Sequence, residues 1–371
     1  MVLTNSFKKI VSHLAAAFLS AALGGATAGP AANSSVSTRA TMTAPQSIFI
    51  SGHSLTDSVL SSDVAAIAAA FGRPVHWNLQ YLAGSTIKAR SEDGKRGLNR
   101  ANQPKMNRPA KHPERPYDVL LITEQHSLLG SLVWSNTIRY LRDFHDRFIE
   151  SNPQGLTFFY VPWLSLDDKS SPKRWIAYER AADPVWTCVV EEINGSIGMD
   201  GRGDRIRLLP AALALAKLVE LATQGAGLPG ITQRSVRATV DSLVADDVHL
   251  TRLGTYYMAL VVFAYTFGYS PQGAWHPADV TEAQAKALQE TAATFVAHAS
   301  SPVMPLAECQ VYVRQTFMWT YLGYADAVQW RRERGLFGAL YLRLKASVQW
   351  MRLFASDGPD NPFSAAAYRR N

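Results

Sequence analysis

The chain has 371 residues, of which 47% are hydrophobic and 18% are charged, and its formal net charge is +7. The length allows one large domain with a sizeable core, or a domain with an extension. The moderate positive charge favours contact with anionic surfaces or polymers. The sequence argues against a nucleic-acid partner, because it has no basic recognition motif interleaved with aromatic residues.

The first 28 residues have the three parts of a secretory signal peptide. Lys8 and Lys9 form a positive region, residues 10–23 are mostly apolar, and Ala26-Thr27-Ala28 is a typical cleavage site. The apolar part is short for a membrane span, and an uncleaved N-terminal anchor is the alternative. Residues 29–44, rich in Ala, Ser and Thr, are typical of a flexible leader. We therefore expect a secreted or periplasmic protein, whose net charge falls to +5 once Lys8 and Lys9 are removed.

The mature sequence opens with an apolar run at residues 48–50, which predicts a strand ending at Gly52. Ser54 follows two residues later, and apolar residues at helical spacing then predict a helix over 55–71. A serine at such a strand-to-helix turn lies at the C-terminal edge of the sheet, where α/β proteins bind ligands. The helix N-terminus would also stabilise an oxyanion. The alternative is that Ser54 only caps the helix, with Asp57 completing a capping box.

The next segment combines a strand, a glycine turn and a long basic stretch. Residues 75–79 predict a strand, and it leads to a turn in which Gly84 would let the backbone approach another group closely. Residues 88–116 are basic, interrupted by prolines and too long for an ordinary connection. We expect a solvated surface loop there, with a functional loop as the alternative.

Strands and helices alternate through the rest of the chain up to about residue 275. We expect strands at 118–123, 156–163 and 206–209, and helices at 132–149, 174–193, 211–223 and 234–244. This alternation predicts an α/β fold with an open parallel sheet covered by helices on both faces. Residues 253–269 are uncharged and long enough to span a membrane, but we interpret them as a buried helix of the same domain.

The C-terminal part, residues 276–371, is expected to be a helical extension, because the pattern from residue 281 onward is helical throughout. Aromatic residues and arginines alternate in its last part. Its basic and aromatic face could make peripheral contact with an anionic surface or stack on sugars; alternatively, it packs on the preceding domain. Cys188 and Cys309 either form a disulfide that closes a long loop or remain free thiols.

Asp246 and His249 lie three residues apart in a loop before the helix at 253–269. A serine hydroxyl needs a base to take its proton, and an imidazole base needs a carboxylate to fix its tautomer. This one loop can supply both groups to Ser54. The G-x-S-x-G motif of α/β-hydrolases is not formed, since Thr56 occupies the place of its last glycine.

Gly52-His53-Ser54-Leu55-Thr56-Asp57 and Asp246-x-x-His249 resemble the first and last sequence blocks of the SGNH (GDSL-like) hydrolase family. The resemblance covers roughly residues 45–270. It implies a flavodoxin-like three-layer sandwich with a central parallel sheet over residues 45–275. It also implies that Ser54 is the nucleophile, His249 the base and Asp246 its orienting carboxylate. The Ser54 and Gly84 N–H groups and an asparagine side chain would form the oxyanion hole.

Two features depart from the family's pattern. His53 replaces the usual aspartate before the nucleophile, and the Gly-x-Asn-Asp block is missing. Glu124-Gln125-His126-Ser127 stands in its place, so Gln125 or His126 would be the third oxyanion donor. Loss of such a donor typically lowers turnover by roughly 100- to 1000-fold.

We therefore expect an exported serine esterase that needs no metal or organic cofactor. Its substrate would be an O-acyl ester, preferably acetyl, on a saccharide, or another small ester. Acyl transfer by the same three residues is one alternative, and a degenerate SGNH-fold carbohydrate-binding or scaffold protein is another. A metal site built from Asp246, Asp247, His249, His126 and His53 is a chemical rival, although no zinc motif supports it.

Overall fold

The computed structural model describes residues 45–92, 117–299, 303–356, 358 and 360–364. These residues all belong to one unit, Met42–Asn371. The expected signal peptide, the leader and residues 93–116 of the basic segment lie outside the described residues.

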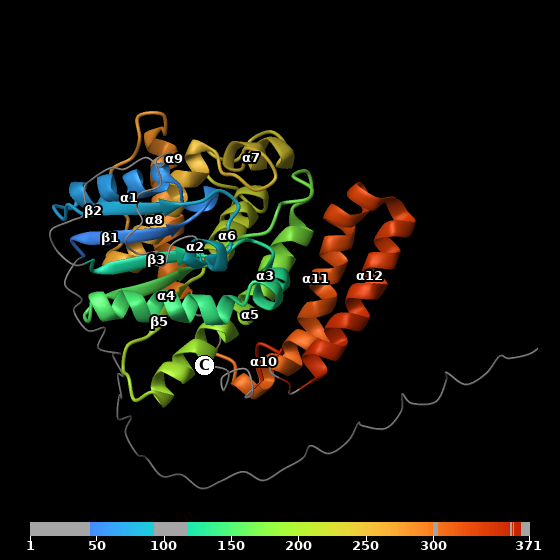
Figure 1. Ribbon diagram of the computed structural model, residues 1–371. Helices are drawn as coiled ribbons and strands as arrows, with labels where there is room; N and C mark the ends of the chain where they lie inside the picture. The colour runs from blue at the N-terminus through green and yellow to red at the C-terminus, as the bar shows by residue number, and fades with distance from the viewer. Residues whose placement is uncertain (1–44, 93–116, 300–302, 357, 359, 365–371) are drawn as a thin grey trace, which may run out of the picture. The chain divides into compact units, whose positions relative to one another are not determined.

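Five strands form one sheet in the order β2-β1-β3-β4-β5, and every neighbouring pair is parallel (Figure 1). The strands are β1 (Ser47–Gly52), β2 (His76–Tyr81), β3 (Val119–Thr123), β4 (Leu156–Tyr160) and β5 (Ile206–Leu209). Strands β1 and β3 are buried along their whole length, as expected of strands covered on both faces. The register pairs Gly52 with Tyr81 and Thr123 with Tyr160, so the carboxyl ends of four strands meet at one edge.

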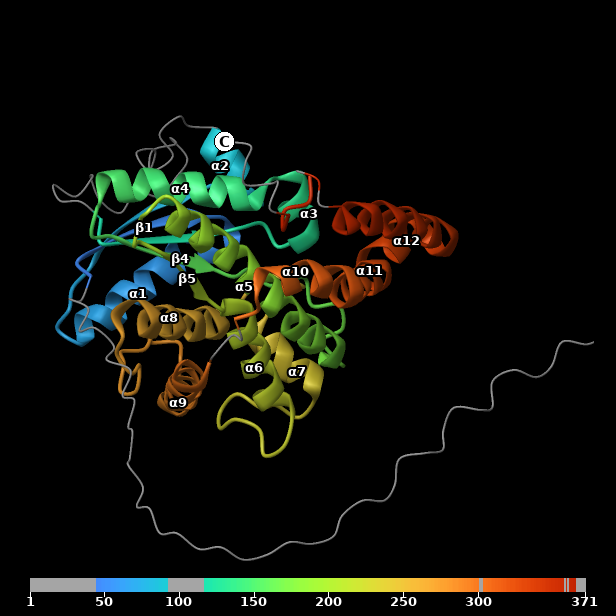
Figure 2. The same ribbon diagram turned by 90° about the horizontal axis from the view of Figure 1, so that it is seen from below.

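Helices cover both faces of the sheet, so the expected α/β three-layer arrangement with a parallel sheet is confirmed. Figure 2 shows α2 and α4 on one face and α1 and α8 on the other. The helices up to residue 299 are α1 (Ser58–Ala70), α2 (Ile87–Glu92), α3 (Leu128–Trp134), α4 (Thr137–Ser151), α5 (Lys173–Met199), α6 (Ala211–Thr223), α7 (Val236–Leu243), α8 (Arg252–Phe267) and α9 (Glu282–His298).

Three expected helices have clearly different bounds in the structure, and one of them, expected at 174–193, continues to Met199 as α5. The helix expected at 132–149 is two helices, because Asn136 adopts a left-handed conformation (φ 50°) between α3 and α4. The helix expected from residue 55 begins at Ser58, since the Asp57 carboxylate accepts hydrogen bonds from the first free N–H groups of α1. Residues 54–56 form a separate 3-10 turn.

Helix α8 corresponds to the uncharged segment at 253–269 and is buried on nearly all sides, in contact with α1 and α9. Our interpretation of this segment as a buried helix is therefore confirmed. Among the described residues, no helix combines the length and the apolar character needed to cross a membrane.

The last part of the described chain forms a helical hairpin. It contains α10 (Leu306–Tyr312), α11 (Met318–Ala325) and α12 (Arg331–Ala355), with the π-helical turns η3 (Val313–Phe317) and η4 (Asp326–Trp330) between them. The chain reverses at Gly335, whose φ of 65° and ψ of 179° interrupt α12. After this turn α12 runs back along α11 and η4 (Figure 1).

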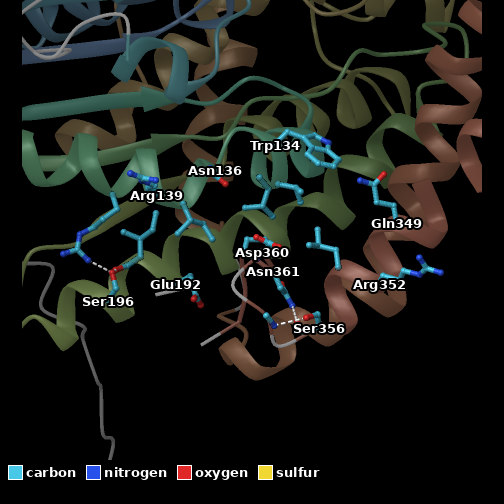
Figure 3. Close-up of a pocket in the computed structure, with 18 of the residues that line it drawn as sticks. Trp134, Asn136, Arg139, Glu192, Ser196, Gln349, Arg352, Ser356, Asp360 and Asn361 are labelled. Carbon is cyan, nitrogen blue, oxygen red and sulfur yellow. Dashed lines mark hydrogen bonds between the residues drawn. The ribbon is translucent and has the colours of Figure 1, made fainter. Parts of the chain in front are cut away.

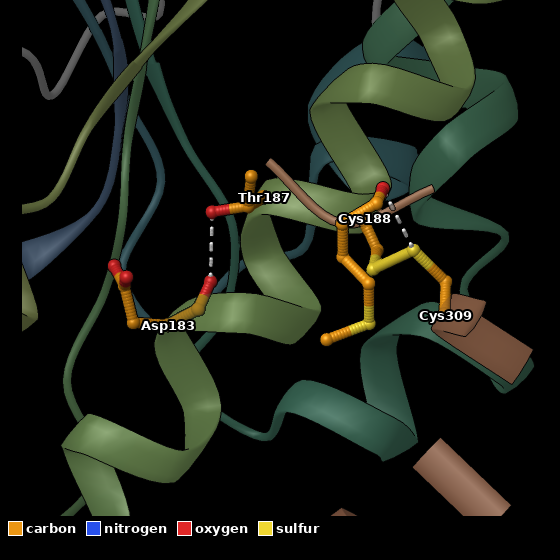
Figure 4. Close-up of a disulfide and its surroundings, with 5 residues drawn as sticks. Asp183, Thr187, Cys188 and Cys309 are labelled. Atoms are coloured by element: carbon orange, nitrogen blue, oxygen red, sulfur yellow. Dashed lines mark hydrogen bonds between the residues drawn. A yellow bond between two sulfur atoms is a disulfide. The ribbon is translucent and has the colours of Figure 1, made fainter. Parts of the chain in front are cut away.

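The disulfide left open by the sequence is present. Cys188 of α5 and Cys309 of α10 are bonded, and the bridge closes a loop of 121 residues (Figure 4). Aromatic hydroxyls add polar contacts between the hairpin and the rest of the chain. Tyr312 donates to the Ala181 carbonyl at 2.9 Å, and Tyr324 donates to the Ser165 carbonyl at 2.6 Å.

Candidate active site

Ser54 lies just beyond the carboxyl end of β1, in the 3-10 turn that precedes α1. The close approach of the 3-10 turn to the end of β1 requires glycine at position 52. A Cβ atom there would lie only 1.8 Å from the Thr56 hydroxyl oxygen. Asp57 caps α1, so the interpretation of Ser54 as the helix cap is wrong. The Ser54 hydroxyl instead lies 2.9 Å from Nε2 of His249, a residue 195 positions later in the chain.

Asp246 and His249 are held together by a short loop between α7 and α8. An antiparallel bridge between Val244 and Leu250 closes this loop. Oδ1 of Asp246 accepts hydrogen bonds from the N–H groups of Val248 and His249, both at 2.7 Å, and Oδ2 lies 2.7 Å from Nδ1 of His249. A carboxylate only accepts, so Nδ1 carries the imidazole proton and Nε2 presents a lone pair to Ser54.

The same hydrogen bonds keep Asp246 ionised. Partial burial acts to raise the pKa of its carboxyl, but the N–H groups of His249 and Val248 and the His249 ring outweigh this and lower the pKa to about 2. The side chains of His249 and Asp246 are 45% and 54% exposed, so water reaches the site. An ionised carboxylate, an oriented imidazole and a serine hydroxyl in one hydrogen-bonded row can together activate the hydroxyl as a nucleophile.

Gly84 lies in the turn after β2, beside the end of β1. The Leu82 N–H donates to the Gly52 carbonyl at 3.1 Å, and the Ser85 N–H donates to the Leu82 carbonyl at 3.2 Å. Gly84 has a φ of +63°, and no atom lies within 4 Å of where its Cβ would be. Glycine is therefore favoured here by the left-handed backbone and not by lack of space.

The two candidates for a third oxyanion donor face different surroundings. The side-chain oxygen of Gln125 accepts hydrogen bonds from the Ser127 N–H at 2.8 Å and the Ser131 hydroxyl at 3.1 Å, so it serves the start of α3. His126 lies within electrostatic range of His249. Burial lowers the pKa of His126; Asp247 opposes this and His249 adds to it. Of the two side chains, His126 is the one that interacts with the candidate base.

A buried arginine beneath the site was missed by the sequence interpretation, which placed Arg90 in a solvated loop. That expectation is wrong for Arg90, which lies in α2 and is only 1% exposed. Its guanidinium donates to the Ser51 hydroxyl of β1 at 3.0 Å, to the Ser85 carbonyl at 3.0 Å and to the Thr123 carbonyl of β3. The arginine thus links the ends of two strands to the turn that contains Gly84.

Glu124, at the end of β3, is the buried acid near this arginine. Its carboxylate accepts hydrogen bonds from the Ile87 N–H at 2.9 Å and the Thr137 hydroxyl at 2.9 Å. Burial raises the pKa of Glu124 and lowers that of Arg90 to about 10; each charge opposes the shift of the other. We call these two residues and their hydrogen-bond partners the Arg90–Glu124 network.

His53, the residue that departs from the SGNH pattern, is joined to the same network. Its Nε2 lies 2.8 Å from the Glu124 carbonyl oxygen, which can only accept, so the ring proton is on Nε2. Nδ1 then accepts from the Leu55 N–H at 3.4 Å. Burial is the main cause that lowers the pKa of His53 to about 4, so the ring is neutral at neutral pH. His53 therefore supports the serine turn and does not face His249.

The rival metal site is not assembled in the part of the chain that the structure describes. No group of three or more His, Cys, Asp and Glu side chains there could hold a metal ion. His53 points to a backbone carbonyl, and His249 is engaged by Ser54 and Asp246.

A cavity of about 1490 Å³ lies elsewhere, between α3, α4 and α5 and the outer helix α12 (Figure 3). Trp134, Arg139, Glu192 and Gln349 are among its lining residues, whereas Ser54, Asp246 and His249 are not. The hydrogen-bonded serine row thus lies outside this cavity.

Comparison with known proteins gives little information about the family. No protein-family model and no curated protein matches the chain. Among solved structures, the chain is similar to a DUF4886 family protein from Bacteroides uniformis, with 13% identity and a TM-score of 0.46. The match covers 71% of this chain and 98% of that chain. A likeness this distant carries no argument about function.

Proposed function

We propose that the protein is an exported serine esterase of the SGNH type, which hydrolyses O-acyl esters through an acyl-enzyme. The proposal rests on one observation, the row Ser54–His249–Asp246 with contacts of 2.9 and 2.7 Å. Its support at the level of the fold is the strand order β2-β1-β3-β4-β5, which flavodoxin-like sheets share, together with the place of Ser54 at the carboxyl end of β1.

The residues act in two half-reactions. Oγ of Ser54 attacks the ester carbonyl while Nε2 of His249 takes its proton, and Asp246 stabilises the resulting imidazolium. The tetrahedral intermediate collapses when His249 returns the proton to the departing alcohol, which leaves an acyl group on Ser54. A water molecule then loses a proton to His249 and attacks this acyl group, and the acid departs as Ser54 regains its proton.

The negative charge of the tetrahedral intermediate needs hydrogen-bond donors beside Ser54, at the carboxyl edge of the sheet. We assign the N–H groups of Ser54 and Gly84 to this role, with His126 as the third donor. Gln125 would have to donate through its amide NH2 group, and it is the weaker candidate because the hydrogen bonds to its side-chain oxygen hold that amide against the start of α3. Burial keeps His126 neutral at neutral pH, and a neutral imidazole still carries one N–H to donate.

An ester on a saccharide is the preferred substrate, because the imidazole and the carboxylate are about half exposed and a bulky substrate could reach them. The same exposure favours hydrolysis over acyl transfer, since transfer requires that water be kept away from the acyl-enzyme. The intact row of hydrogen bonds argues against a degenerate binding protein, for which no such alignment is needed.

The test is labelling of the full chain with a serine-directed phosphonate, followed by turnover of short-chain aryl esters. Wild type and the control Ser58→Ala should be labelled and active, because Ser58 belongs to the first turn of α1 and not to the row. Ser54→Ala should be neither labelled nor active. Equal labelling of wild type and Ser54→Ala would exclude Ser54 as the nucleophile.

A further inference from the structure

Helix α12 beyond Gly335 is apolar on two opposite faces. One face is buried against the rest of the hairpin and includes Ala339, Trp350 and Phe354. The other is open: Phe337 is 85% exposed, and the side chains that share its face are also exposed. This outer face consists of Leu336, Phe337, Leu340 and Met351. Tyr341, Leu344 and Val348 are exposed as well, but they line the cavity between α12 and the helices α3, α4 and α5. A helix that is apolar on most of its circumference is normally covered, so the outer face is expected to have a partner.

The charges around this face have one sign. Residues 331–352 contain six basic residues and one acid, Glu333. The basic residues are Arg331, Arg332, Arg334, Arg343, Lys345 and Arg352. Lys345 and Arg352 line the same cavity, whereas Arg343, at 100° per residue, falls along the edge of the outer face that is remote from the cavity. Arg331 and Arg343 share Asp326, at 2.9 and 3.7 Å, whereas within the described residues Arg332 and Arg334 make no ion pair.

We propose that the outer face of α12 binds the surface of a membrane that contains anionic lipids, with the helix lying in the plane of the surface. The apolar side chains would enter the lipid at headgroup depth, and the arginines beside them would meet the phosphates. This surface is independent of the ester chemistry proposed above. The charge also argues against a second copy of the chain as the partner. Residues 331–352 carry a net charge of +5, from six basic residues and one acid, so two copies of this segment would repel each other.

The hairpin lies beside the edge of the sheet that carries Ser54. In α11, Tyr321 hydrogen-bonds the Ser127 hydroxyl at 2.8 Å, and Tyr324 binds the Ser165 carbonyl, so α11 contacts the loops after β3 and β4. The chain then stays helical for about ten residues, roughly 15 Å, before it turns at Gly335 (Figure 1). Binding through α12 would therefore hold this edge of the sheet near the lipid surface.

Co-sedimentation of the full chain with vesicles tests the proposal. Wild type should bind vesicles of phosphatidylcholine mixed with phosphatidylglycerol at least about tenfold more tightly than vesicles of phosphatidylcholine alone, and salt should weaken the binding. The double variants Phe337→Ser with Leu340→Ser, and Arg332→Glu with Arg334→Glu, should each lose at least about tenfold in affinity.

Matched controls change similar residues elsewhere. Met199→Ser removes an apolar side chain that is 73% exposed on α5, and Arg234→Glu with Arg237→Glu reverses two exposed charges near α7. Both should bind as wild type does. Equal binding to both lipids, or equal binding by wild type and the α12 variants, would overturn the proposal. A dimer that forms without lipid and is lost in the Phe337→Ser variant would assign the face to a second copy instead. Circular dichroism of every variant establishes that it is folded.

Discussion

The edge of the sheet that carries Ser54 and the outer face of α12 use charged residues in opposite ways. At the sheet edge, Arg90 is buried and its N–H groups reach oxygens on β1, on β3 and in the turn after β2. On α12 the arginines border an exposed apolar face. Burying a charge costs several kcal/mol unless it is paired, so a buried arginine fixes its surroundings, whereas exposed ones remain available to a partner. In our proposal, the first region positions side chains for chemistry and the second presents a binding surface.

The largest effect should come from Asp246→Asn, which interrupts the positioned row without removing volume. An amide in place of the carboxylate no longer fixes the proton on Nδ1 of His249, and we expect turnover of an aryl ester to fall by roughly 10⁴-fold. Asp247→Asn is the matched control, because Asp247 is next in the chain but makes no hydrogen bond to the His249 ring among the described residues. A loss below tenfold in Asp246→Asn would mean that Asp246 does not orient the base.

Arg90→Met should destabilise the protein by roughly 3 to 5 kcal/mol, because it leaves the buried Glu124 carboxylate without its compensating charge. Urea unfolding at neutral pH measures this change in the free energy of unfolding. The double variant Arg90→Met with Glu124→Gln should recover part of the loss, since the uncompensated charge is gone. Arg332→Met on the exposed side of the comparison should change the free energy of unfolding by no more than about 0.5 kcal/mol. Equal effects of the two arginine variants would contradict the distinction between the regions.

Replacement of the assigned third oxyanion donor should act on turnover and not on folding. We expect His126→Ala to lower kcat by roughly 100- to 1000-fold with a smaller change in KM. Gln125→Ala should lower kcat by less than about tenfold, because hydrogen bonds to its side-chain oxygen hold its amide group against the start of α3 and away from the donor role. Steady-state kinetics on one aryl ester decides between them. If the order of the two effects is reversed, Gln125 is the donor.

Much of the candidate site could be predicted from the sequence, because its residues lie in two short segments whose order and spacing are informative. The Arg90–Glu124 network could not. Nothing distinguishes Arg90 from Lys88 or Arg96 in a basic stretch, and its burial follows only from the way β1, β3 and the turn after β2 meet. Glu124 directly follows a strand in which four apolar residues precede Thr123, and this apolar run is the one signal in the sequence for a buried acid there.

The parallel sheet was also predictable, since its strands are apolar runs separated by helical patterns. The break between α3 and α4 was missed because the apolar spacing continues across it. Asn136 carries the signal, as asparagine tolerates the left-handed conformation that it adopts there. The sequence could not decide whether the disulfide forms, because a separation of 121 residues gives no information about the distance between two cysteines in the fold.

Glu179 is a second buried acid besides Glu124, and the pH dependence of the free energy of unfolding tests the effect of its burial. Burial raises the pKa of Glu179 to about 8, and its carboxyl accepts a hydrogen bond from the Leu164 N–H at 2.7 Å. The folded state therefore holds a proton that the unfolded chain releases above about pH 4.5. Stability should fall as the pH rises from about 4.5 to about 8, with a slope of up to about 1.4 kcal/mol per pH unit from this group.

Glu179→Gln should remove that part of the slope, measured by thermal unfolding over this pH range. His53, with a pKa of about 4, gives the opposite slope up to about pH 6.5, so only the difference between variant and wild type isolates Glu179. Glu191→Gln on the same helix is the control. A Glu179→Gln profile parallel to that of wild type would mean that Glu179 does not take up a proton on folding.

The smallest effect on stability is expected for a substitution on the outer face of α12. This small effect would show that the folded chain leaves the face uncovered. Phe337→Ser should change the free energy of unfolding by no more than about 0.5 kcal/mol, since the ring contacts little of the folded chain. Trp350→Ala on the inner face of the same helix should cost about 3 kcal/mol, because its buried ring lies 5.2 Å from that of Tyr321. Urea unfolding without lipid gives both values. A cost above about 1 kcal/mol for Phe337→Ser would mean that another part of the protein covers this face in solution, and the face would then be unavailable to a membrane.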